Sequence, residues 1–242
     1  MIDRSQRHAA RVFAIAYPLT VTLMAIAFTR WLAPILVWNH ETETARNITK
    51  HLHDYRMFMG ASCLNGVAGV VLLSALYLLL RPVNRGLALL AAFSRLVYVA
   101  MWFVQLLDSF GAVRILTGVE CQGVLDARQL QALAALRLAS GWDAYYIGLT
   151  FYGLSSLVLG FLFLQSRYVP RIVAWWGMLA SFFEMTCAFA YLNDRGFGAV
   201  ISANWYEMPV VAFELSVSIW FLTRGLKKPA PLRASPEPVE RF

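Results

Sequence analysis

Charged residues are scarce in this chain, making up only 14% of its 242 residues. A typical soluble domain carries about 25% charged residues. Hydrophobic residues instead reach 59%, and the mean hydropathy is +0.57. The composition therefore excludes an ordinary soluble domain and predicts a protein whose solvent is partly lipid.

Cysteine and histidine are also rare, with three and four residues respectively. The cysteines are distributed without a paired framework, so we expect no disulfide. The link between the first two apolar stretches combines histidines with acidic residues, but their spacing matches no strong zinc signature. We therefore expect neither a metal site nor a cofactor. The residues concerned are Cys63, Cys121 and Cys187, and His40, His51 and His53.

The sequence Gly153-Leu154-Ser155-Ser156 is similar to part of the Gly-x-Ser-Gly motif of rhomboid-type intramembrane proteases. The final glycine of that motif is missing, and all four histidines precede Asp54. No imidazole is therefore available within an apolar stretch to activate a buried serine. We therefore do not expect intramembrane serine proteolysis.

Six apolar stretches of roughly twenty residues dominate the chain. A helix needs about 20 residues to cross the hydrocarbon core, and only helices or closed barrels satisfy their backbone hydrogen bonds there. Long runs such as Val70 to Leu80 do not alternate as barrel strands do. The sequence predicts an all-α polytopic membrane helix bundle with spans at 12–37, 57–80, 87–111, 143–165, 172–192 and 206–223.

Basic residues crowd every second link, twelve against seven in the alternate links. This bias predicts that both termini are cytoplasmic. Because the basic residues stand at helix ends, nucleic acid is not an expected partner, despite the net charge of +7. The twelve are Arg4, Arg7, Arg11, Arg81, Arg85, Arg167, Arg171, Arg224, Lys227, Lys228, Arg233 and Arg241.

We interpret 1–225 as a single transmembrane domain and the proline-rich segment 226–242 as a flexible cytosolic tail. The segment Ala127 to Ser140 has one polar and one apolar side, which favours a separate helix lying at the outer interface. The first span also has features of a signal peptide, but its apolar character resumes as far as Trp38, so we expect it to be retained.

Ionisable residues within the spans are the best candidates for a functional site, because a charge in hydrocarbon costs roughly 2.5 to 3.5 kcal/mol. Arg95 and Glu214 are both expected roughly 12 to 14 Å from the inner ends of their helices, so they can form an ion pair. That pair either binds a ligand or fixes the helix register. Arg95 is accordingly a predicted ligand-binding residue and Glu214 a predicted catalytic one.

Glu184, near the middle of the fifth span, has no evident partner in the sequence. A buried neutral carboxylic acid can donate a proton, which makes Glu184 our candidate proton donor. The alternative is a hydrogen bond to Asn65 or Gln105, two polar residues that we also predict to contact a ligand.

Acidic residues near the outer ends of the spans form a second set, either as a mouth for a cation or polar head group or as ordinary interfacial residues. They are Asp108, Asp143 and Glu207, and Asp108 is also assigned to the predicted catalytic cluster. Aromatic residues make up 14% of the chain. The deeper ones, including Tyr152, Phe182, Phe183 and Phe213, are expected to wall an apolar pocket, with Tyr152 and Phe183 in contact with the ligand.

Two segments carry a resemblance to a known family. They are the run LLLRPVNRGLALLAAFSRL from Leu78 to Leu96, and Tyr146-Ile147-Gly148-Leu149 with its continuation to Arg171. The chain resembles, from about Arg11 to Gly225, the bacterial integral membrane proteins called domain of unknown function 4386. The resemblance implies a bacterial cytoplasmic-membrane protein with about six helices, and it implies no reaction.

Three functions remain open from the sequence. The polar cluster can bind an amphiphilic or isoprenoid-like molecule, with acid catalysis of the terpene cyclase kind as an enzymatic alternative. A small carrier is the second possibility, and at this length it would need a homodimer. A structural membrane subunit is the third. The expected partners are membrane lipid and an apolar small molecule.

Overall fold

The computed structural model describes residues 3–118, 125–194, 196–201 and 203–226. The predicted all-α fold is confirmed. In chain order the elements are α1 (Arg4–Ala27), the π-helical turn η1 (Phe28–Leu32), α2 (Glu41–Lys50), α3 (Leu52–Leu80), α4 (Arg85–Thr117), α5 (Ala127–Ser166), α6 (Arg171–Asn193), α7 (Phe197–Val200) and α8 (Ala203–Arg224).

Five helical segments are long and apolar enough to cross a membrane, which agrees with five of the six predicted spans. They are Arg4–Leu32, Leu52–Leu80, Arg85–Thr117, Ala127–Ser166 and Arg171–Asn193. The sixth predicted span, 206–223, lies in α8. Glu207, Pro209 and Glu214 interrupt the apolar residues of this helix.

Two outer segments differ from expectation. The first outer link contains the helix α2, whose polar sequence ETETARNITK gave no apolar signal. The predicted interfacial helix from Ala127 to Ser140 is wrong, because these residues are the first part of the continuous helix α5. Ala134 and Leu138 are buried there in a core cluster shared with α2 and α4. At 1.5 Å per residue, α5 is about 60 Å long and extends beyond a hydrocarbon core of about 30 Å.

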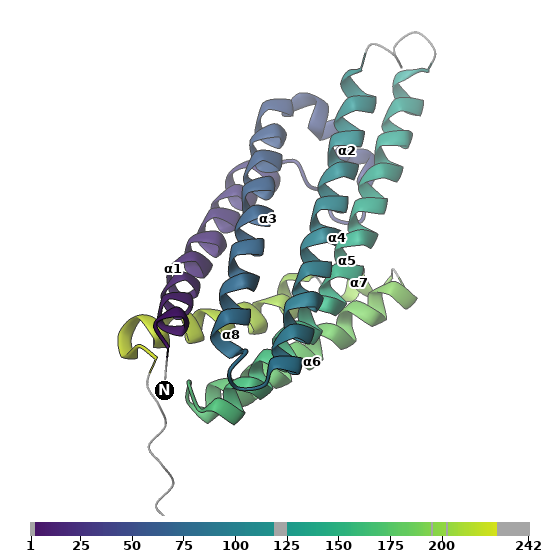
Figure 1. Ribbon diagram of the computed structural model, residues 1–242. Helices are drawn as coiled ribbons and strands as arrows, with labels where there is room; N and C mark the ends of the chain where they lie inside the picture. Colours follow the sequence, from purple (N-terminus) through teal and green to yellow (C-terminus); the bar gives the residue numbers. More distant parts are fainter. Residues whose placement is uncertain (1–2, 119–124, 195, 202, 227–242) are drawn as a thin grey trace, which may run out of the picture.

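Figure 1 shows α1, α3, α4 and α5 running alongside one another, while α6 and α8 cross them obliquely. The amino terminus and the α3–α4 and α5–α6 turns lie toward the lower end of that view, which we call the inner end. These segments carry many of the basic residues that predicted a cytoplasmic face.

Local sequence features fix the helix ends at this inner end. Asn84 caps α4 by accepting a hydrogen bond from the Leu87 amide at 3.1 Å, and Arg167 ends α5 in the left-handed conformation with φ of 54°. Asp3 caps α1 in a capping box with Gln6. Hydrogen bonds from the Ser5 hydroxyl and the Arg4 amide lower the pKa of the Asp3 carboxyl.

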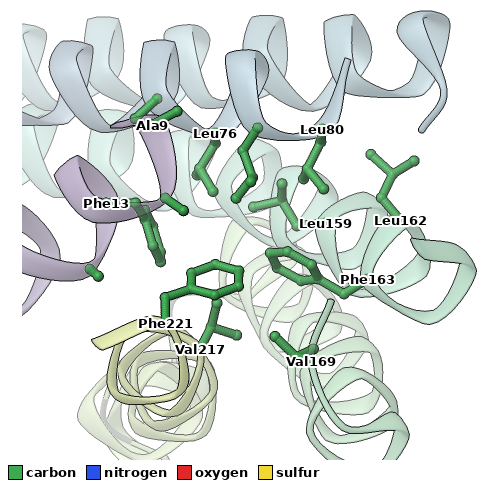
Figure 2. Packing of buried hydrophobic residues seen from close by; sticks show 14 of the residues in the cluster. Ala9, Phe13, Leu76, Leu80, Leu159, Leu162, Phe163, Val169, Val217 and Phe221 are labelled. Carbon is green, nitrogen blue, oxygen red and sulfur yellow. The ribbon is translucent and has the colours of Figure 1, made fainter. Parts of the chain in front are cut away.

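The largest hydrophobic cluster joins α1, α3, α4, α5 and α8 near the inner end (Figure 2). In Figure 2, Phe13 from α1, Leu76 from α3, Phe163 from α5 and Phe221 from α8 point toward one another. The helices α5 and α6 also approach closely, since a Cβ at Gly160 would stand 2.8 Å from the Cγ of Met178. This packing holds the inner ends of the helices together below the polar residues described next.

Cys63 and Cys187 are free thiols in the structure. Cys121 and the tail that we predicted at 226–242 fall outside the described residues, except for Leu226.

Candidate functional site

An ion pair inside the bundle joins Arg95 of α4 to Glu214 of α8, as the depth argument predicted. Nη2 of Arg95 contacts Oε1 of Glu214, and Nη1 lies 3.5 Å from Oε2. The two side chains are only 9% and 2% exposed. The planar guanidinium thus faces both carboxylate oxygens, the geometry that best compensates two buried charges.

Two adjacent serines of α5 complete the hydrogen bonds of this pair. The hydroxyl of Ser156 accepts from Nη2 of Arg95 at 3.0 Å and donates to Oε1 of Glu214 at 2.8 Å. The hydroxyl of Ser155 accepts from Nε of Arg95 at 3.4 Å and donates to the carbonyl of Ala91 at 2.9 Å. The network leaves Arg95 with little hydrogen-bonding capacity for a ligand.

Two tyrosines extend the network toward α1. The guanidinium carbon of Arg95 lies 4.0 Å from the ring centroid of Tyr152, a cation–π contact. The hydroxyl of Tyr152 lies 3.4 Å from that of Tyr17. Four helices, α1, α4, α5 and α8, therefore supply one connected polar cluster.

A cavity of about 620 Å³ lies beside this cluster and is lined mainly by residues of α1, α3, α4, α5 and α8, with further residues from η1, α2, α6 and α7. Such a volume falls within the range of small-molecule binding sites. Arg95, Glu214 and Tyr17 all line it. On α4 the lining runs from Arg95 to Ser109, a distance of about 21 Å along the helix, so the cavity is elongated.

One wall of the cavity is a continuous series of aromatic rings that ends beside Arg95. The ring centroids lie 4.7 Å apart for Tyr152 and Tyr98, 6.2 Å for Tyr98 and Trp102, 5.9 Å for Trp102 and Tyr145, 5.9 Å for Tyr145 and Trp142, and 5.7 Å for Trp142 and Trp38. Aliphatic side chains of α1 and α3, including Val21 and Leu73, also line the cavity.

Of the predicted ligand-binding residues, Arg95, Asn65, Gln105 and Tyr152 all line this cavity. Phe183 does not line it, because its side chain faces outward from α6 and is 46% exposed. The ligand-binding role of these residues remains a prediction.

Glu184 is completely buried on α6 and is not among the residues that line the cavity. Neither of its carboxylate oxygens has a hydrogen-bond partner within the described part of the chain. The alternative hydrogen bond to Asn65 or Gln105 is therefore wrong. The predicted role of Glu184 as a proton donor is untested, and the structure separates it from the cavity surface.

Asp108 lies about 20 Å from Arg95 along α4, so the two do not form one cluster. Its carboxylate is paired with Arg137 of α5 at 3.3 Å. Of the three residues in the predicted acidic mouth, Glu207 lines the cavity, while Asp108 and Asp143 do not.

The histidine-rich outer link remains without a metal-like geometry. In the ranges that the structure describes, no group of three or more histidine, cysteine, aspartate or glutamate side chains is placed to hold a metal ion.

Sequence reasoning missed Tyr17, Ser155 and Ser156 as members of the polar cluster. The position of Ser156 along its helix could have indicated this role. Arg95 lies ten residues from the inner end of α4, Glu214 ten from that of α8, and Ser156 ten from that of α5. All three thus stand about 15 Å from the inner helix ends.

The fold and this cavity define a multi-pass α-helical membrane protein with an aromatic-walled pocket between its helices. The family model described as Domain of unknown function (DUF4386) matches residues 12–225, and the chain belongs to this family. No curated protein and no solved structure matches the sequence.

Proposed function

We propose that this membrane protein binds an elongated amphiphilic molecule, such as a lipid or an isoprenoid-like compound, in the cavity between its helices. The observation that carries the proposal is the cavity of about 620 Å³ itself, which combines a long aromatic and aliphatic lining with a buried polar cluster at one end. A purely structural bundle would gain dispersion energy by filling such a space with side chains.

The chemistry of the lining suits a ligand with two unlike parts. Aromatic rings such as Trp102 and aliphatic side chains such as Leu73 offer dispersion contacts to a hydrocarbon chain. The amides of Asn65 and Gln105 and the hydroxyl of Tyr17 offer hydrogen bonds to a polar group. In a mostly apolar pocket, a small number of polar groups fixes the orientation of the bound molecule.

The proposal is tested by a substitution that fills the cavity. Leu73 lines it from α3, so Leu73→Trp places a larger side chain in the ligand's space. Leu64 lies on the same helix but is 59% exposed on the outer surface, and Leu64→Trp is the matched control. Each protein is purified in mild detergent, and the small molecules that copurify are extracted and quantified by mass spectrometry.

We expect wild type and Leu64→Trp to retain a discrete amphiphile at close to one molecule per chain, and Leu73→Trp to lose most of it. An identical lipid profile for all three proteins would contradict the proposal, because the bound molecules would then be annular lipid.

An acid-catalysed enzyme of the terpene cyclase kind is less well supported, because Glu184, its candidate proton donor, does not line the cavity. No observation specifically favours a carrier. We also infer that the protein lies in the bacterial cytoplasmic membrane with both termini inside, which the bias of twelve basic residues against seven supports.

A further inference from the structure

We infer that the cavity selects an amphiphile whose polar end is a cationic amine, bound by Glu207 and the aromatic rings around it. This inference rests on the proposed function and names the chemical class of its ligand.

The charges along the cavity are unbalanced. Three carboxylates line it, those of Glu41, Glu207 and Glu214, against the single guanidinium of Arg95. Glu214 already forms an ion pair with Arg95. Two acidic side chains thus remain in the described lining without a basic partner there, and a low-dielectric site with this excess attracts a cation and repels an anion.

Glu207 of α8 is the acidic residue best placed to meet a ligand. The hydroxyl of Tyr145 on α5 faces its carboxylate and interacts with it electrostatically. Oε1 of Glu207 is buried and has no hydrogen-bond partner among the residues that the structure describes. A buried acceptor that the protein leaves unsatisfied requires a partner from elsewhere, and an ammonium group supplies one with the opposite charge.

Aromatic rings accompany Glu207 along the cavity. Tyr145, which faces Glu207, stands edge-on to Trp102 with centroids 5.9 Å apart, and Trp102 in turn neighbours Tyr98. The indole nitrogen of Trp102 donates to the carbonyl of Ser62 at 2.9 Å, which fixes the orientation of the ring. Aromatic faces next to a carboxylate are the recurrent means of binding alkylammonium groups.

The same chemistry already operates within the protein. The guanidinium of Arg95 lies between the carboxylate of Glu214 and the ring of Tyr152. The site at Glu207 has a carboxylate and aromatic rings of the same kind, but no described cation of the chain occupies it.

The experiment uses two photoreactive probes with the same long alkyl chain, one ending in a primary ammonium group and the other in a hydroxyl. The full chain in lipid nanodiscs is labelled with each probe at several concentrations, and the half-saturating concentrations are compared. Glu207→Gln keeps the shape of the side chain and removes its charge. Glu43→Gln, an exposed position on α2 outside the cavity, is the matched control.

We expect wild type and Glu43→Gln to prefer the ammonium probe by about tenfold or more, which corresponds to one charge-assisted contact. Glu207→Gln loses most of that preference but binds the hydroxyl probe as wild type does. Trp102→Leu weakens the binding of the ammonium probe more than that of the hydroxyl probe. Absence of this preference in wild type overturns the inference by itself, so that arm of the test does not depend on the variants folding.

Equal binding of the two probes to wild type, or a preference that Glu207→Gln retains, would overturn the inference while leaving the amphiphile pocket intact. Tighter binding of a matched carboxylate probe would overturn it as well. If Leu73→Trp is labelled by both probes to the same extent as wild type, the probes do not enter the cavity, and both the inference and the proposed function fail.

Discussion

Replacing one member of the Arg95–Glu214 pair should destabilise the protein far more than replacing both. In Arg95→Met the carboxylate of Glu214, 2% exposed, keeps only the hydroxyl of Ser156 as a hydrogen-bond donor. In Glu214→Leu the guanidinium of Arg95 keeps the two serine hydroxyls and the Tyr152 ring but loses its counterion. Each variant leaves one buried charge uncompensated.

The expected cost of either single substitution is about 3–5 kcal/mol in the free energy of unfolding. That is a large part of the roughly 5–15 kcal/mol that stabilises a typical protein. The double variant Arg95→Met/Glu214→Leu removes both charges and replaces them with side chains that suit the apolar surroundings. It should cost less than either single variant, because no desolvated charge remains.

Reversible unfolding in mixed micelles with increasing sodium dodecyl sulfate, followed by tryptophan fluorescence, measures all four proteins on one scale. The four values form a double-mutant cycle, from which the interaction energy of the pair follows. Single-variant costs that simply add in the double variant would refute the reasoning, since the two charges would then not compensate one another.

Two smaller stability predictions use the same assay. Gly177→Ala introduces a Cβ into the ring of Phe213 and should lower the free energy of unfolding by about 1–3 kcal/mol. In the control Gly60→Ala nothing lies within 4 Å of the new atom, so this variant should be neutral or slightly stabilising. Equal effects of the two substitutions would argue against this close approach of α6 and α8. Asn84→Ala removes the cap of α4 and should cost about 1 kcal/mol, and an unchanged unfolding midpoint would show that the cap contributes nothing.

Much of the fold could be predicted because membrane spans leave a strong local signal. Runs of apolar residues marked the helices, and the Arg95–Glu214 pair followed from equal depth in two of them. The helix α2 could not be predicted in this way, because its sequence is polar and short. The continuity of α5 was missed because its amphipathic first part suits an interfacial helix as well as the packing against α2 and α4 that it makes.

The cavity itself could not be predicted from the sequence. Tyr17, Trp102 and Glu207 belong to three helices, and their convergence depends on how α8 packs on α1 and α6 while α4 packs on α3 and α5. Aromatic content alone did not distinguish Tyr152, which lines the cavity, from Phe183, which faces outward. Side-chain direction on a helix changes by about 100° per residue, so a rotation of one position reverses such assignments.

The most direct test of the central claim is a density map of the purified protein in lipid nanodiscs. The account predicts elongated non-protein density within the cavity between α1, α3 and α4, with its polar end beside Glu207. A cavity closed by side chains, or density for lipid only around the outer surface of the bundle, would contradict it.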